Sequence, residues 1–390
     1  MTSADDRSGL EFRVAQWALW IVLGLILFVG MVGQAEARLD DPALCTPAER
    51  AQGLEQCLTP SPILIRATPA PSRPPGEAAA NPSEGSDPVD LVPFTYARVI
   101  TTHMPVYASP EDAALGLPPV RNLGAGYLWV SLGKRPTYVE SNGETWVMIN
   151  KGEYVRASAI SVYRPSRFQG VELAEQPAVP FAWILKPVQP SKTPGGPPDP
   201  EAPKLNRYDI VNIYDTKVVN DVRWDQIGQD QWIDHRRVGQ VAVSPRPEGV
   251  GPTEKWIEVN LYEQTLAAYE GDRMVYATLV SSGLPQWATP EGLTRIWIKL
   301  RVAKMSGAEG RSDYYFLEDV PWIMYFNKAV GLHGAYWHDG FGYVRSHGCV
   351  NLAPRDAEWL FNWTTPVVPE GTNSVLSTED NPGTWVWVHR

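Results

Sequence analysis

Residues 333–351 read His-Gly-Ala-Tyr-Trp-His-Asp-Gly-Phe-Gly-Tyr-Val-Arg-Ser-His-Gly-Cys-Val-Asn, and they combine a cysteine with three of the chain's six histidines. A cysteine attacks a carbonyl as the thiolate, so it needs a lowered pKa or an adjacent base, and histidine suits that role at neutral pH. Gly348 directly precedes Cys349 and permits a tight turn, whose successive N–H groups can hold a developing oxyanion. The order histidine, glycine, cysteine therefore indicates acyl transfer.

The wider pattern resembles the catalytic signature of the L,D-transpeptidases, the YkuD-type domain. His333 precedes Cys349 by 16 positions, and residues 346–351 read Ser-His-Gly-Cys-Val-Asn. Other segments resemble the family's opening hairpin, two of its turns and its closing segment: Ile257-x-Val259-x-Leu261 with Gln264, Leu266 and Tyr269; Ser281-Ser282-Gly283; Thr289-Pro290-x-Gly292; and Gly371-Thr372 with Val375. The resemblance covers residues 254–378, roughly a third of the chain.

The resemblance implies a role for each matching residue. Cys349 would be the acylated nucleophile and His333 its base, with the carbonyl of Gly334 orienting the imidazole. Backbone amides around His347, Gly348 and Cys349 would form the oxyanion hole. The remaining expected site residues support the loop or contact substrate: Ser346, His347 and Asn351 for support, and Trp337 and Tyr325 for lining the acyl-donor pocket.

The same resemblance implies a two-step reaction on peptidoglycan. The thiolate attacks the carbonyl of the third residue of a tetrapeptide stem, the terminal D-Ala leaves, and an amine of a neighbouring stem makes a 3→3 cross-link. Neither a metal nor an organic cofactor is implied, and carbapenems would be competing acyl donors.

Three alternatives stay open at this point. Water could replace the amine, which would make the protein an L,D-carboxypeptidase, and a lipoprotein or other protein could be the acceptor. The protein could also be a non-catalytic wall-binding anchor. A zinc site built from His333, His338, His347, Asp339 and Cys349 fits no common zinc spacing. We expect His338 and Asp339 to be solvated residues of a variable lid.

The N-terminal segment predicts export. Residues 14–33 form a run without formal charge that is long enough to span a bilayer, and Ala35-Glu36-Ala37 resembles a signal-peptidase site. A cleaved signal peptide and a membrane anchor both place the chain from residue 38 onward outside the cytoplasm. Cys45 and Cys57 could pair there, which leaves Cys349 as an odd thiol that needs a chemical reason.

Two segments ahead of the C-terminal domain predict short strands and repeat each other. Trp146 corresponds to Trp224, 78 positions later, and the same offset relates Tyr154 to Trp232 and Ile160 to Val238. This pattern is similar to bacterial SH3-like wall-binding modules. We expect a Pro-rich tether over 38–93, modules over 94–170 and 207–245, a linker over 171–206, and a terminal strand over 379–390.

The predicted fold class is mainly β: a β-sandwich-like catalytic domain, two small β-barrels before it and an N-terminal apolar helix. One helix is expected at 354–363, directly after the cysteine, because Pro354 suits a first helical turn and Asp356 favours its positive end. The formal net charge of −10 argues against nucleic acid as a partner, since a phosphate backbone needs a clustered basic surface.

Overall fold

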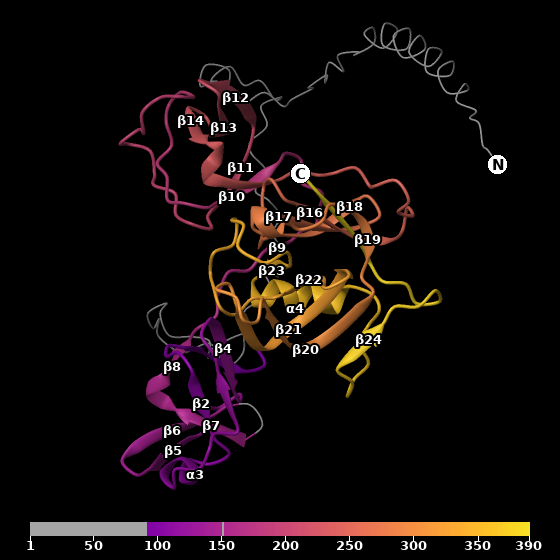
Figure 1. Ribbon diagram of the computed structural model, residues 1–390. Helices are drawn as coiled ribbons and strands as arrows, with labels where there is room; N and C mark the ends of the chain where they lie inside the picture. Colours follow the sequence, from indigo (N-terminus) through magenta and orange to yellow (C-terminus); the bar gives the residue numbers. More distant parts are fainter. Residues whose placement is uncertain (1–91, 150–151) are drawn as a thin grey trace, which may run out of the picture. The chain divides into compact units, whose positions relative to one another are not determined.

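The computed structural model describes residues 92–149 and 152–390, and most of its elements are strands (Figure 1). The predicted apolar helix, the Cys45–Cys57 pair and most of the tether lie outside the described residues. Within the described ranges, the structure holds no helix that combines the length and the apolar character needed to span a membrane.

The first group of strands occupies residues 95–163. Strand β1 pairs antiparallel with β4 and β8, while β5, β6 and β7 form a second small sheet and β2 pairs with β3. Its elements are β1 (Thr95–Val99), β2 (Met104–Val106), α3 (Pro110–Ala114), β3 (Arg121–Leu123), β4 (Tyr127–Leu132), β5 (Tyr138–Ser141), β6 (Glu144–Ile149), β7 (Glu153–Arg156), η3 (Ala157–Ala159) and β8 (Ile160–Tyr163).

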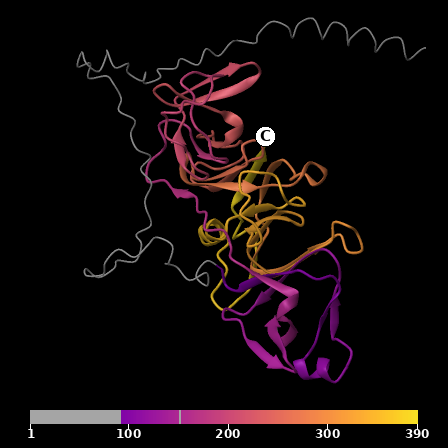
Figure 2. The same cartoon turned by 90° about the vertical axis from the view of Figure 1, so that its left-hand side faces the viewer.

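A second group of strands repeats part of the first. Its elements are β11 (Ile210–Asn212), β12 (Asp215–Val219), β13 (Val222–Gly228), β14 (Gln231–Asp234), η4 (His235–Arg237) and β15 (Val238–Val241). The bounds of β14, η4 and β15 lie 78 positions after those of β7, η3 and β8, which is the offset read from the tryptophans. Each group is compact in Figure 2. The description of either group as an SH3-like module stays a prediction.

The expected linker over 171–206 was wrong in part, because two strands lie in it: β9 (Val171–Glu172) and β10 (Phe181–Ile184). β10 pairs with both β11 and β15, and β9 pairs with a strand of the C-terminal domain. The apolar residues Phe181, Ala182, Trp183 and Ile184 are all buried, so the surrounding prolines mark turns between packed strands and not a solvated spacer.

The C-terminal domain consists of one helix and two sheet arms that share β18. One arm runs β19-β25-β16-β17-β18, and the other continues β18-β23-β22-β21 with β20 and β24 beyond. Its elements are β16 (Lys255–Asn260), β17 (Thr265–Glu270), β18 (Arg273–Ser281), η5 (Pro285–Trp287), β19 (Gly292–Arg295), β20 (Ile298–Gly307), β21 (Tyr315–Asn327), β22 (Val330–Gly334), β23 (Val350–Leu352), α4 (Pro354–Trp363), β24 (Ser374–Leu376) and β25 (Trp385–His389).

Helix α4 has the predicted bounds. Ala357, Leu360 and Phe361 are buried on one face of the helix. Strand β25 pairs parallel with β16, so the C-terminal strand belongs to the sheet of this domain.

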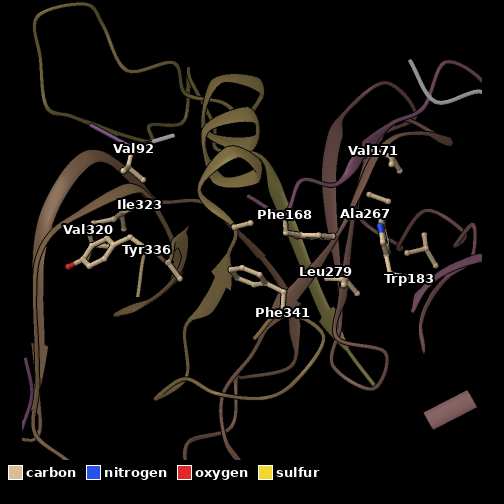
Figure 3. Packing of buried hydrophobic residues seen from close by; sticks show 14 of the residues in the cluster. Val92, Phe168, Val171, Trp183, Ala267, Leu279, Val320, Ile323, Tyr336 and Phe341 are labelled. Atoms are coloured by element: carbon tan, nitrogen blue, oxygen red, sulfur yellow. The ribbon is translucent and has the colours of Figure 1, made fainter. Parts of the chain in front are cut away.

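The largest apolar cluster joins segments that are far apart in the sequence. Figure 3 shows Phe168 beside Phe341, and their ring centroids lie 6.1 Å apart. Trp183 belongs to the same cluster, together with Ala267 and Leu279 of β17 and β18. The segment between the two strand groups is therefore packed into the core of the C-terminal domain.

Strand β4 of the first group continues the sheet of the C-terminal domain. It pairs parallel with β21, with Tyr127 opposite Tyr315 and Trp129 opposite Leu317. Glu318 accepts hydrogen bonds from the Ser131 amide at 3.1 Å and from Arg121 at 3.2 Å. This junction places one edge of the first group next to the residues described below.

Candidate active site

Parallel pairing of β22 and β23 brings the two ends of the 333–351 motif together. His333 is registered opposite Asn351, and Leu332 is opposite Val350. Cys349 directly precedes β23 and stands next to Val350, which is registered opposite Leu332. The parallel register thus brings the histidine end and the cysteine end of the motif close together.

The turn that carries Cys349 is held by side-chain hydrogen bonds. Gly348 has φ +118°, in the region that favours glycine. The hydroxyl of Ser346 accepts from the Gly348 N–H at 3.0 Å and donates to the Cys349 carbonyl. Because the Gly348 N–H is engaged in this way, the amides of His347 and Cys349 are the remaining candidates among the three expected oxyanion donors.

Two turns that are distant in the sequence contact the Cys349 turn and hold its backbone in place. The Thr289 hydroxyl accepts from the Gly283 N–H at 2.9 Å and donates to the Gly348 carbonyl at 2.8 Å. A Cβ on Gly283 would lie 2.1 Å from the Trp287 carbonyl and 3.0 Å from the Gly348 Cα, so only glycine allows this approach. The Ser-x-Gly and Thr-Pro-x-Gly segments therefore position the cysteine turn.

A cavity of about 310 Å³ opens over this turn. It brings together six of the predicted site residues: His333, Trp337, Ser346, His347, Cys349 and Asn351. The lining residues that the sequence analysis did not identify are Tyr127, Met305, Asp313, Tyr315, Leu317 and Arg345. Of these six residues, only Arg345 lies within the 333–351 motif. The other five come from separate strands and loops, and no local sequence pattern connects them with the motif.

Burial keeps His333 and Cys349 neutral at pH 7. His333 is 2% exposed, and this burial lowers its pKa to about 4 although the Gly334 carbonyl opposes the shift. Burial raises the pKa of the Cys349 thiol, against a smaller lowering by the Gly331 N–H. The pair is a thiol with a nearby neutral base, so the base has to remove the proton as the sulfur attacks.

The orientation of His333 follows from its backbone contact. Its Nδ1 lies 3.4 Å from the Gly334 carbonyl oxygen, which only accepts hydrogen bonds. Nδ1 therefore carries the proton and Nε2 is the basic nitrogen. This contact is the one that the family resemblance implies.

His347 lines the cavity, and its side chain is partly exposed. Its ring stacks on Trp287 with centroids 3.9 Å apart and lies 5.0 Å from the Tyr315 ring. Its Nε2 is 3.7 Å from Asp313. Packing against two rings fits the supporting role that was expected of it.

The two expected substrate-binding residues differ in position. Trp337 lines the cavity, with its ring 5.6 Å from that of His333. Tyr325 is not among the lining residues, and it stacks on Trp297. Burial raises the pKa of Tyr325 to about 12, and the proximity of Cys349 adds to this shift.

The expectation that His338 is a solvated lid residue was wrong. His338 is 3% exposed, and its ring contacts Phe341 with centroids 4.8 Å apart. Its neighbour Asp339 is exposed but engaged, since its side chain accepts from Ser166 and from Tyr208. The segment after Trp337 folds back onto the apolar core, and a solvated loop would not.

The described ranges contain no group of three or more His, Cys, Asp or Glu residues arranged to hold a metal ion. Cys349 is unbridged. Cys349 and His333 can together perform nucleophilic attack by the sulfur, with the imidazole as the base.

Comparison with known proteins agrees with this geometry. Residues 254–388 match the YkuD family, described as the L,D-transpeptidase catalytic domain. Within the chain, this segment is similar to L,D-transpeptidase catalytic domains. The match extends past residue 378, the expected end, and includes β25 up to Val388.

Individual relatives match the same region. The chain is 29% identical over 154 residues to L,D-transpeptidase 1 of Mycobacterium tuberculosis, which covers 37% of this chain and 60% of that protein. It is 27% identical over 146 residues to YciB of Bacillus subtilis (strain 168), covering 31% of this chain and 65% of that protein. The chain thus spans less than two thirds of either relative.

Among solved structures, a mutant of the Enterococcus faecium L,D-transpeptidase is 27% identical, with a TM-score of 0.28, and the match covers 35% of this chain and 50% of that one. The catalytic domain of the same E. faecium enzyme acylated by ertapenem is 26% identical, with a TM-score of 0.28, and the match covers 36% of this chain and all of that one.

Proposed function

We propose that this protein is a peptidoglycan L,D-transpeptidase that acts through a Cys349 thioester and forms 3→3 cross-links. The observation that carries the proposal is the pairing of β22 with β23, which sets a buried neutral His333 beside the turn of Cys349 in one cavity. The match of residues 254–388 to the catalytic domain supports it.

In the first step, the Cys349 sulfur attacks the carbonyl of the third stem residue while Nε2 of His333 takes the thiol proton. The C–S bond forms, the C–N bond to the terminal D-Ala breaks, and the protonated His333 returns the proton to the leaving amine. The amides of His347 and Cys349 stabilise the oxyanion. No ATP is needed, because one stable amide is exchanged for another through the thioester.

In the second step, an amine of a neighbouring stem attacks the thioester carbonyl. The new C–N bond forms, the C–S bond breaks, and the amine proton passes through His333 to the departing sulfur. This step restores the thiol and the neutral imidazole. A carbapenem would enter the same first step, because opening its strained lactam by sulfur also gives an acyl-enzyme.

The parts ahead of residue 254 are assigned to wall targeting in this proposal. The apolar run at 14–33 would export or anchor the chain, which places the catalytic domain outside the cytoplasm. The two repeated strand groups would bind the wall as SH3-like modules. The 78-residue repeat of strands and 3₁₀ turns supports this reading.

The test incubates the full chain with disaccharide-tetrapeptide and separates the products by mass, with Cys349→Ala as the control. Cross-linked dimer and released D-Ala, both absent in the control, are expected. Tripeptide alone would replace the proposal with L,D-carboxypeptidase activity. No turnover by folded protein would leave a wall-binding anchor, which wall pull-down would then measure.

A further inference from the structure

The active-site cavity is lined by an acidic residue that the mechanism above does not use. Asp313 lies in the loop between β20 and β21, two positions before β21 begins, and it lines the cavity together with His347 and Cys349. Its Oδ2 is 3.7 Å from Nε2 of His347, and its side chain is 20% exposed. The carboxylate therefore borders the cavity and keeps surface that a ligand can reach.

The ion pairs of Asp313 leave its charge available to a ligand. Its cationic partner is Arg311, with Nε 3.1 Å from Oδ1 and Nη2 3.3 Å from Oδ2. The side chain of Arg311 is itself 66% exposed, and ion pairs at such surface positions stabilise little. Arg345 lines the same cavity, but the ion pairs of the described residues do not join it to Asp313. A cation that enters the cavity would thus compete only with weak partners.

An apolar wall of the cavity leads along β21 to this carboxylate. Tyr315 and Leu317 both line the cavity, and their spacing of two places them on one face of the strand. Leu317 is registered opposite Met305 of the neighbouring strand β20, which lines the cavity as well (Figure 1). Asp313 precedes Tyr315 at the same spacing of two positions. The cavity therefore combines an aliphatic and aromatic wall with an acidic group beyond it.

This wall and its carboxylate lie beside the turn of the nucleophile. The Tyr315 ring is 5.0 Å from the ring of His347, which stands two positions before Cys349. Burial raises the pKa of Tyr315, and the proximity of Cys349 adds to this shift. Because Tyr315 and Asp313 both contact His347, a side chain that branches from an acyl group on the sulfur has both within its surroundings.

One chemical group of the proposed acyl donor suits these features. The third stem residue is a diamino acid, so its side chain is an aliphatic stem that ends in an amine. An alkyl amine has a pKa of about 10.4 and is an ammonium at pH 7. Aliphatic stems of this kind pack along apolar surface while the charged end keeps a polar partner, and tyrosine rings also attract cations. Met305, Leu317 and Tyr315 offer the apolar surface, and Asp313 offers the partner.

We propose that Asp313 is a specificity-determining residue that binds the side-chain ammonium of the diamino acid at the third position of the acyl donor. The inference rests on the proposed function for the identity of the donor. Asp313 takes no part in proton transfer or bond exchange, and it selects donors by the charge of their side chain. The β20–β21 loop then shares in donor selection with the 333–351 motif.

Two donors separate the amine from the rest of the peptide: the disaccharide-tetrapeptide with a free side-chain amine, and the same molecule with that amine acetylated. Adduct formation on Cys349 is followed by intact mass in wild type and Asp313→Asn. In the wild type, kcat/KM for acylation should be roughly 5- to 50-fold higher for the free amine, mainly through KM. Asp313→Asn should lose most of this preference, and Asp313→Glu should keep part of it. Equal preference in wild type and Asp313→Asn would overturn the inference.

The paired donors also separate the contact from indirect effects. Asp313→Asn removes a charge near His347, but a change in the Cys349 turn would slow both donors equally, and the bulk of the acetyl group is common to both proteins. Glu309→Gln is the matched control, because Glu309 is an exposed acid of the same loop that is not among the lining residues, and it should keep the wild-type preference. If Asp313→Asn slowed only the cross-linking of preformed acyl-enzyme, Asp313 would serve the acceptor amine and the donor assignment would be wrong.

Binding to Cys349→Ala tests the inference without catalysis. Isothermal titration calorimetry gives Kd for both donors in Cys349→Ala and in Cys349→Ala/Asp313→Asn, as full-length proteins. Only the first protein should bind the free amine roughly 5- to 50-fold more tightly than the acetylated one. Equal Kd values, or no measurable binding of either donor, would contradict the assignment. This preference together with an absence of adduct in the wild type would instead refute the proposed function and keep Asp313 as the ammonium site.

Discussion

At the scale of single residues, the candidate active site keeps its two reacting groups uncharged until substrate arrives. Burial lowers the pKa of His333 to about 4 and raises that of Cys349. A preformed thiolate–imidazolium pair would require the opposite shifts. Proton transfer must therefore accompany attack, and the sequence pattern alone does not distinguish these two modes.

The reactivity of the thiol should follow this arrangement. Alkylation of Cys349 by iodoacetamide should be slow at pH 7 and rise with pH through a midpoint above the ordinary thiol pKa of about 8.5. The rate of carbamidomethylation, followed by mass over pH 6–11, measures it. Fast alkylation with a midpoint below pH 7 would show an ion pair and contradict the neutral assignment.

The buried histidines should also make stability depend on pH. Each has a folded pKa below the unfolded value of about 6.5, about 4 for His333 and about 3 for His338, so the unfolded chain takes up protons that the folded chain refuses. Stability is full above pH 6.5 and falls toward pH 4, by up to about 1.4 kcal/mol per pH unit for each histidine.

Urea unfolding of wild type and His338→Phe at pH 4.5–7.5 tests this dependence. The variant should be less stable overall but show a shallower fall with acid, because one of the two histidines is gone. The comparison removes the contribution of carboxylates that are common to both proteins. Parallel slopes would show that His338 is protonated in the folded state.

At the scale of elements, the parallel pairing of β22 and β23 brings the two ends of the motif together. A turn that is distant in the sequence then fixes the Cys349 loop through the hydrogen bond from Thr289 to the Gly348 carbonyl. The sequence signature predicted His333 and Cys349 as partners, and Pro354 with Asp356 predicted helix α4. The same reasoning missed β10, because its four buried residues stand among prolines that normally mark a linker. His338 was misjudged because it falls in the lid between the two ends of the motif, where a solvated residue was expected, whereas the structure buries it.

The brace by Thr289 can be tested by one substitution. Thr289→Val removes the hydroxyl that links the Gly283 N–H to the Gly348 carbonyl, leaving two buried backbone groups unpaired. We expect a loss of about 1–3 kcal/mol in unfolding free energy and slower acylation. Thr294→Val is the matched control, because the Thr294 hydroxyl is buried without a partner in the described part of the chain. Equal effects of both substitutions would refute the brace.

At the scale of the whole molecule, the first strand group takes part in the candidate active site. Tyr127 of β4 lines the cavity, and its hydroxyl donates to the Trp337 carbonyl at 3.2 Å. The two residues are 210 positions apart, and no local pattern indicates such a contact. The sequence could therefore delimit the strand groups, but it could not relate them to the site.

The contribution of Tyr127 should appear in substrate binding. Tyr127→Ala opens one wall of the cavity and should raise KM for the tetrapeptide roughly 5- to 20-fold, while Tyr127→Phe, which loses only the hydroxyl, should have a smaller effect. The exposed Tyr138→Ala in β5 is the control. Unchanged KM in Tyr127→Ala would mean that the C-terminal domain binds the donor alone.

The measurement that tests the central claim most directly is intact-protein mass spectrometry of the full chain mixed with disaccharide-tetrapeptide, with peptide mapping of any adduct. The account predicts a transient adduct of the tetrapeptide minus D-Ala on Cys349. It should be absent in Cys349→Ala and form roughly 10²–10⁴-fold more slowly in His333→Ala. An adduct on another residue, or an unchanged rate in His333→Ala, would contradict the assignment of nucleophile or base.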